Sequence, residues 1–151
     1  MANLTTALNG TDIKVYDSST NILVAYAQSG TLNVNHSTRD ISNKESSGWA
    51  EAMEGQRNWD ISVDGAYAWT DTSGTALTNG ADDMLNTYIL TRTSVVIRFG
   101  STDTTGVGNI YYEGTAWLTS FSVSAPNEDT ATYSLSFTGT GALTQTVDTT
   151  A

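Results

Sequence analysis

The sequence predicts a mainly β protein, either a β-sandwich or a partial barrel, with one flanking α-helix. Thr, Ser, Gly and Asn are abundant and there is a single proline, a composition that favours strands and turns. Apolar and polar residues alternate in several segments, and one segment has helical spacing. The length of 151 residues indicates one domain. We expect extended polar arms at residues 1–10 and 143–151.

The first predicted strands lie before residue 37. Ile13 and Val15 are followed by an apolar segment at residues 22–26, and the DSSTN stretch between them predicts a turn. A further strand is predicted where Leu32, Val34 and His36 alternate with Thr and Asn.

Residues 37–58 keep neither the strand period nor the helical period, and we predict a long loop there. Long loops inside compact domains usually bind a partner or are disordered, and disordered segments are poor in aromatic residues. Trp and Arg are enriched at interface centres. We therefore predict an interface with another copy of the chain, formed by Arg39, Asp40, Lys44, Trp49, Met53 and Arg57. In the alternative interpretation, this is a surface loop whose tryptophans close the end of the core.

The segment after the loop predicts a strand with one buried face. Trp59, Ile61 and Val63 occupy odd positions, and acidic and polar residues lie between them. One helix is predicted at about residues 80–91, because apolar residues recur there at helical spacing. These residues are Ala81, Met84, Leu85, Tyr88 and Ile89.

Three further strands complete the prediction. The first contains Val95, Ile97 and Phe99. The second, over residues 110–125, places Trp117, Phe121 and Val123 on a buried face. A turn at residues 126–129 then leads to a strand that buries Tyr133, Leu135 and Phe137.

The charge balance excludes several functions. Sixteen acidic residues face six basic ones, giving a net charge of −10, which disfavours binding to nucleic acid by counterion release.

The absence of cysteine excludes disulfides and thiolate metal sites. No apolar run approaches the ~20 residues of a membrane span. The start of the chain lacks the pattern of a signal peptide, so we expect synthesis in the cytoplasm.

The search for catalytic chemistry predicts no enzyme, cofactor or metal site. His36 is the single histidine, and no G-x-S-x-G motif frames a nucleophile. Asp60 and Asp64 lie about 13 Å apart along one strand, farther than the roughly 5–9.5 Å of glycosidase carboxylates. The sequence DTSGT at residues 71–75 offers oxygen ligands for calcium, but a solvated turn is the simpler interpretation.

Four motifs occur in order along the chain: DISNKESSGW, GQRNWDISVDG, YEGTAWLTS and EDTATYSLSFTGTGAL. They resemble the tail tube proteins of long-tailed bacteriophages, the lactococcal type in particular. Each is weak alone, but together and in order they cover roughly residues 31–143.

The resemblance implies a structural subunit of the virion tail, assembled in the host cytoplasm. Identical copies are expected to join their sheets into hexameric rings, and the rings to stack into a hollow tube that conducts DNA during ejection. The loop at residues 37–58 and the terminal arms would reach neighbouring copies. The resemblance also implies the tape measure, terminator and distal tail proteins as partners, and no membrane.

A negative lumen wall would let DNA slide without sticking, and Asp60, Asp64 and Glu113 are the candidates for that wall. Solubility explains the excess of acidic residues equally well.

The main alternative to a long-tailed phage protein is the tube subunit of a contractile phage or a phage-derived bacteriocin. A carbohydrate-binding or receptor-binding module is a further one, but it predicts an exposed row of aromatic residues. Trp59, Trp69, Trp117 and Tyr133 follow core alternation instead.

Overall fold

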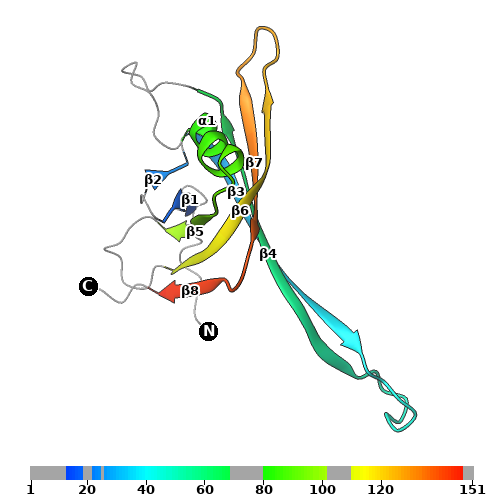
Figure 1. Cartoon of the computed structure of the whole chain (residues 1–151). Coiled ribbons are helices and arrows are strands. Elements are labelled where there is room, and N and C mark those ends of the chain that lie inside the picture. The colour runs from blue at the N-terminus through cyan, green and yellow to red at the C-terminus, as the bar shows by residue number, and fades with distance from the viewer. Residues whose placement is uncertain (1–12, 19–21, 25, 69–79, 102–109, 148–151) are drawn as a thin grey trace, which may run out of the picture.

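The computed structural model of the protein describes residues 13–18, 22–24, 26–68, 80–101 and 110–147 (Figure 1). Most of this chain is strand, which confirms the mainly β prediction. The strands are β1 (Ile13–Asp17), β2 (Ile22–Leu23), β3 (Ala27–Asp40), β4 (Ala52–Ala66), β5 (Val95–Ser101), β6 (Ile110–Ser124), β7 (Thr132–Gly139) and β8 (Thr144–Val147). They form one sheet in the order β2-β1-β5-β6-β7-β4-β3, with β8 beside β6, and every pair is antiparallel.

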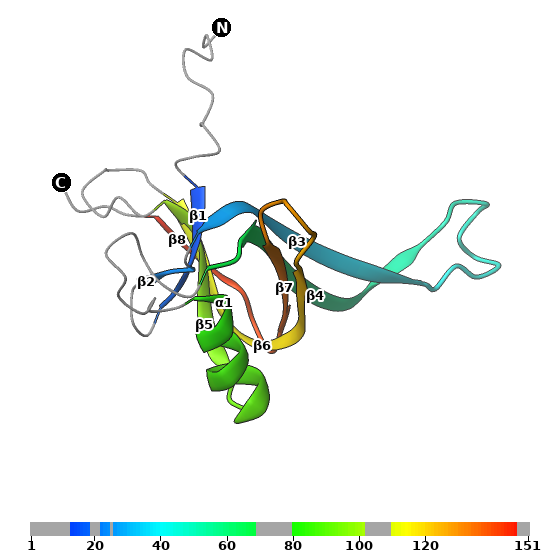
Figure 2. The same cartoon turned by 90° about the horizontal axis from the view of Figure 1, so that it is seen from above.

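The sheet curls on itself, so that of the two predicted architectures the partial barrel is the one present (Figure 2). The curl brings β3, at one end of the strand order, against β1 near the other. A Cβ atom on Gly30 of β3 would lie 2.8 Å from Cγ2 of Val15 in β1. A side chain at this position would have to displace Val15, so glycine suits the close approach of the two strands.

The core fills the concave face of the curled sheet. It confirms the alternation read from the sequence in β7 and in β4 from Trp59 to Gly65, where every second residue is buried. The least exposed of the core side chains include Ile61, Val63, Ile97, Leu135 and Phe137. Trp59 is 4% exposed and closes this core at the point where β4 leaves it.

One helix covers the core, as predicted for residues 80–91. It begins as an α-helical turn, α1 (Ala81–Met84), and continues as a π-helical segment, η2 (Leu85–Leu90). Ala81 and Met84 are buried in the core cluster. The hydroxyl of Tyr88 donates a hydrogen bond to the buried carboxylate of Asp17, which ties the helix to β1.

The prediction of a long loop over residues 37–58 was wrong. Residues 37–40 belong to β3 and residues 52–58 to β4, and these strands pair until Asp40 meets Ala52. The loop is confined to residues 41–51. The strand period was hidden because this ribbon projects beyond the body (Figure 1), so neither of its faces is buried and neither requires apolar residues.

The prediction that Trp117 is buried was also wrong. A β-bulge in β6 places Thr119 between the pairs Leu118–Phe137 and Ser120–Ser136. An extra residue moves the following side chains to the other face. Leu118 is therefore buried before the bulge and Phe121 packs on the core after it, whereas Trp117 is 44% exposed on the opposite face.

Several predictions fall on residues outside the described ranges: the N-terminal arm at 1–10, Trp69, and the DTSGT stretch at 71–75. The predicted C-terminal arm is described as far as Val147, and its residues from Thr144 form β8 against β6. Within the described residues, no helix has the length and apolar character needed to span a membrane.

Candidate assembly interface

The most prominent surface feature is a hairpin that leaves the body, which we call the arm and define as residues 35–58. Its strands extend past the last β4 residue that pairs with β7, Asp60. Every residue of the arm is exposed except the partly exposed Gly55 and the buried Ser46. The arm therefore gains nothing from the core of its own subunit.

Local hydrogen bonds order the loop at the tip of the arm. The N–H of Ser42 donates to the Asp40 carboxylate at 2.8 Å. Hydrogen bonds from the side chain and from the backbone N–H of Ser42 lower the pKa of Asp40 from its ordinary value. The N–H of Ile41 donates to the carbonyl of Glu51 at 2.9 Å. The Ser46 hydroxyl accepts from the N–H of Asn43 at 3.0 Å. An exposed loop closed by its own side chains in this way presents a defined surface.

Trp49 dominates that surface. Its side chain is 80% exposed, in contrast to the 4% of Trp59. Ile41 and Met53 are also exposed on the arm. The interpretation that tryptophans close the core therefore holds for Trp59 and not for Trp49, which has the exposure expected of an interface anchor.

The charges of the arm are only partly compensated. Arg57 lies 3.4 Å from the Glu54 carboxylate, and His36 lies 3.7 Å from the same carboxylate. Within the described residues, no ion pair involves Arg39 or Lys44. These two cations of the predicted interface are therefore available to carboxylates elsewhere.

A β-bulge bends the arm between its base and its tip. His36 pairs with Arg57 and Thr38 with Glu54, so Ser37 faces both Gly55 and Gln56. The Ser37 hydroxyl donates to the Gln56 carbonyl at 3.0 Å. A Cβ atom on Gly55 would lie 2.5 Å from the Ser37 carbonyl oxygen, so only glycine fits this bend.

The predicted acidic wall residues lie on the polar, convex face of the sheet. Asp60 accepts a hydrogen bond from the Asn33 side chain at 3.0 Å, and Asp64 accepts one from Ser29 at 3.4 Å. The register aligns Asp60 with Thr138 and Trp117, and Asp64 with Ser134 and Ser122. Asp60 and Asp64 therefore belong to one surface made of short polar side chains and one exposed tryptophan.

Glu113 differs from these two aspartates because its charge is neutralised. Its carboxylate lies 2.6 Å from the Arg98 guanidinium and accepts the Ser18 hydroxyl at 2.6 Å. Burial acts to raise the pKa of Glu113, but the bonds to Ser18 and Arg98 outweigh it and hold the pKa below its ordinary value. The guanidinium also lies 4.4 Å from the centre of the Tyr111 ring.

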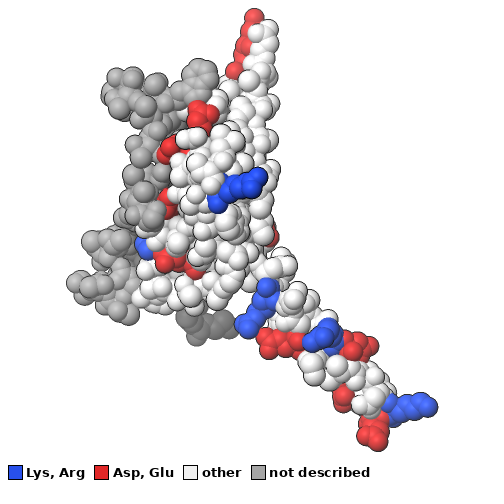
Figure 3. Space-filling model, in the orientation of Figure 1, with Lys and Arg blue, Asp and Glu red and all other residues white. Residues whose placement is uncertain are grey.

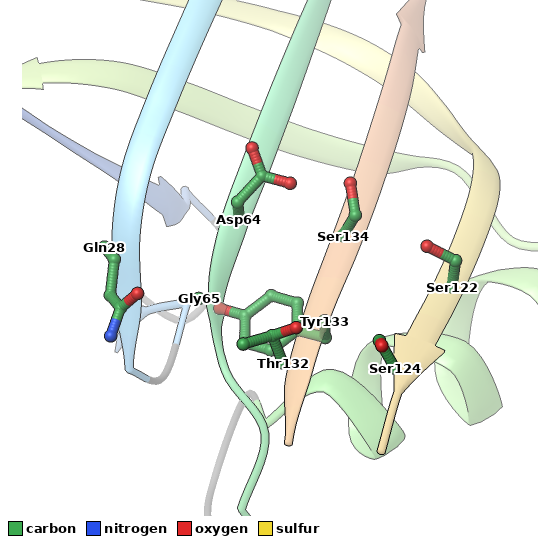
Figure 4. Close-up of a pocket in the computed structure, with 8 residues that line it drawn as sticks. All are labelled: Gln28, Asp64, Gly65, Ser122, Ser124, Thr132, Tyr133 and Ser134. Carbon is green, nitrogen blue, oxygen red and sulfur yellow. The ribbon is translucent and has the colours of Figure 1, made fainter. Parts of the chain in front are cut away.

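A shallow hollow of about 370 Å³ lies on the same convex face (Figure 4). Figure 4 shows Asp64, Ser134 and Ser122 side by side on β4, β7 and β6. Tyr133 forms its floor, and burial together with the nearby charge of Asp64 raises the pKa of Tyr133 to about 12. The lining offers hydroxyl groups, one carboxylate and the amide of Gln28.

The arrangement brings the predicted interface residues together on the arm and separates them from the predicted wall residues. Sequence reasoning missed the exposed Trp117 and the Arg98–Glu113 pair. In the part of the chain that the structure describes, no group of three or more His, Asp or Glu side chains is placed to hold a metal ion. The two exposed tryptophans among the described residues, Trp49 and Trp117, lie in the arm loop and in β6 and form no row.

These features define the class of assembly proteins: a curled β domain that carries an ordered, exposed hairpin beyond its own core. A sequence profile of the family described as "Phage tail tube protein" matches residues 12–145. The chain therefore belongs to the phage tail tube protein family, which confirms the resemblance seen in its motifs.

Solved structures of tail components share the fold. One chain of the native gene transfer agent virion is 22% identical, with a TM-score of 0.74 over 93% of this chain and 99% of that chain. A chain of the empty gene transfer agent tail, refined with C6 symmetry, has the same identity and coverage and a TM-score of 0.73. The SPP1 tail tube protein is 13% identical, with a TM-score of 0.69 over 95% and 81% of the two chains. No curated protein matches the sequence.

Proposed function

We propose that six copies of this chain close into a ring, that the rings stack head to tail, and that DNA passes through the resulting tube. The observation that carries the proposal is the arm, an ordered hairpin whose exposed residues have no use within the monomer. The C6 symmetry of the similar gene transfer agent tail supports six as the number of copies.

The free edge of β3 supports the ring. β3 is 14 residues long, and among the described strands it pairs only with β4. A long unpaired edge is prone to uncontrolled pairing. Sheets of neighbouring copies that join at this edge would satisfy its backbone groups and close a continuous cylinder.

The convex polar face supports its use as the wall of the lumen. Asp60 and Asp64 give it negative charge, and within the described residues no ion pair compensates either carboxylate, so the wall repels phosphate. Glu113 adds no net charge because Arg98 neutralises it. A neutral or basic lumen in a tube structure would refute this assignment but would not contradict the proposal that the chain forms a tube.

The subunit acts as a structural protein of the virion tail and not as an enzyme. Other tail proteins, including a tape measure, a terminator and a distal tail protein, are its partners besides itself. Assembly takes place in the cytoplasm of the host bacterium.

The test is electron microscopy of the concentrated protein beside two arm variants. We expect tubes from the wild type, and few or none from Trp49→Ala or Arg57→Glu, with unchanged β-sheet circular dichroism. Arg92→Glu is the matched control because Arg92 is an exposed cation outside the arm, and it should form tubes normally. Wild-type protein that remains monomeric at every concentration would refute the proposal.

A further inference from the structure

The two ends of β4 differ in their surroundings. At its start, Ala52 pairs with Asp40 in the arm, and at its end, Ala66 pairs with Thr132 beside the turn between β6 and β7. Strand β4 has 15 residues, which corresponds to about 50 Å. The tip of the arm and the β6–β7 turn therefore lie at opposite ends of the molecule (Figure 1).

The turn at residues 125–131 is acidic. Its charged residues are Glu128 and Asp129, both exposed. Asp129 accepts only the N–H of its neighbour Thr130, at 2.7 Å, and no ion pair within the described residues involves either carboxylate. Figure 3 shows this acidic end at the top, where Figure 1 places the turn.

The arm holds half of the basic residues of the chain. It carries three of the six basic residues and four of the sixteen acidic ones, so its net charge is −1, whereas the rest of the chain, with three basic and twelve acidic residues, carries −9. Arg57 is already paired with Glu54, which leaves Arg39 and Lys44 as cations without an ion pair in the described chain. Figure 3 shows basic groups interspersed with acidic ones along the arm, whereas only acidic groups are coloured at the opposite end, at the turn.

We propose that the acidic turn between β6 and β7 of one copy receives the arm of a copy in the next ring, with Glu128 and Asp129 meeting Arg39 and Lys44. This inference rests on the proposed function and names the receiving surface for the arm. Contact between two unlike ends is heterologous, so it repeats without closing and produces an open stack.

The ion pairs in this contact set orientation more than affinity. Exposed pairs contribute little individually, but a ring of six copies makes the contact six times and multiplies the effect. Trp49 and Ile41 at the tip supply apolar area, while the charges select the acidic end and oppose contact between two acidic ends. Because salt screens exposed pairs, added salt should raise the concentration at which tubes form.

The experiment exchanges the charges of the two surfaces. One variant reverses the arm (Arg39→Glu with Lys44→Glu), one reverses the turn (Glu128→Lys with Asp129→Lys), and one carries all four changes. Sedimentation and electron microscopy measure the lowest concentration that gives tubes. Each variant that reverses one surface should raise this threshold concentration at least about tenfold. The variant that carries all four substitutions should return to within about threefold of the wild-type concentration. Arg92→Glu is the control, and thermal unfolding verifies that each variant is folded.

The outcomes separate this inference from the proposed function. If wild-type protein forms no tubes, the proposed function fails. If wild-type tubes form and the reversals leave the threshold unchanged, or the fourfold variant stays as impaired as its parents, the acidic turn is not the receiving surface and the proposed function stands.

Discussion

The two halves of β4 have different physical roles within one continuous strand. From Trp59 to Gly65, side chains alternate between the core and the convex face, and the apolar positions are almost fully buried. From Ala52 to Asn58, the strand has the same backbone pairing with β3 but no buried face. Hydrogen bonding alone therefore maintains a strand without fixing the polarity of its residues.

The difference between the two halves of β4 separates residues that stabilise the fold from residues that are free to act in assembly. Residues in the half of β4 inside the body are constrained by packing, so substitutions there act on the free energy of unfolding. Residues of the arm have no such constraint, and substitutions there should act on assembly alone. Four variants test this division, ordered by the expected effect on unfolding.

The largest effect is expected from Phe137→Ala. Phe137 is fully buried between β4 and β6, and removing a buried aromatic ring typically costs about 3–5 kcal/mol. Urea unfolding should show this loss. Ser136→Ala, which changes the neighbouring side chain on the opposite face, should remain within about 0.5 kcal/mol of wild type; a similar loss in both would contradict the assignment of the two faces.

A smaller and pH-dependent effect is expected from Glu113→Gln. The pKa of Glu113 is lowered in the folded state, so its stabilising contribution is complete above its ordinary value of 4.5 and is lost as the pH falls through the lowered value. At neutral pH the variant should lose about 1–3 kcal/mol. Thermal unfolding from pH 7 down to pH 3 should show the two proteins converging, and a constant difference would contradict the Arg98 pairing.

Trp117→Ala should cost about 1–2 kcal/mol, clearly less than the loss of a fully buried ring, since nearly half of this residue remains exposed. Trp59→Ala is the matched comparison, because Trp59 is buried and its loss should cost about 3–5 kcal/mol. Urea unfolding of both variants distinguishes them. Equal losses would restore the sequence-based prediction that Trp117 belongs to the core.

The smallest effect on the free energy of unfolding is expected from Gly55→Ala. Of the four variants, this one should change the geometry of the arm most. The added Cβ would collide with the Ser37 carbonyl, so the bulge must open while the body stays within about 0.5 kcal/mol of wild type. Tube yield in micrographs should fall, whereas Gln56→Ala in the same bulge should leave it unchanged. Normal tubes from Gly55→Ala would show that the bend has no role in assembly.

The sequence predicted those parts of the fold in which burial imposes a period. Strands β4 and β7 and the helix at Ala81–Leu90 were recognisable because one face of each is apolar. The arm strands were not, since exposure on both faces removes the period. The inserted Thr119 reversed the apparent faces of β6 around Trp117, and a bulge of this kind leaves no local signal in a Thr- and Ser-rich strand.

The candidate site was predictable in composition but not in shape. Scarce cations and a tryptophan in a segment without a period predicted Trp49 and Lys44 as interface residues, and the structure places both on the exposed arm. The Arg98–Glu113 pair joins β5 and β6 across the sheet, and the sequence holds no record of which strands are neighbours. Glu113 was therefore grouped with Asp60 and Asp64, although only those two leave a negative charge uncompensated.

The continuity of β4 also has a mechanical consequence. Tension applied at the arm runs along a strand that is bonded on both sides within the body, to β3 and to β7. Along the pairs from Asp60–Thr138 to Ala66–Thr132, the strands lie parallel to the pull and their hydrogen bonds lie across it, so the bonds are loaded together in shear and cannot unzip one at a time. A subunit held by this hairpin would resist stretching as a unit.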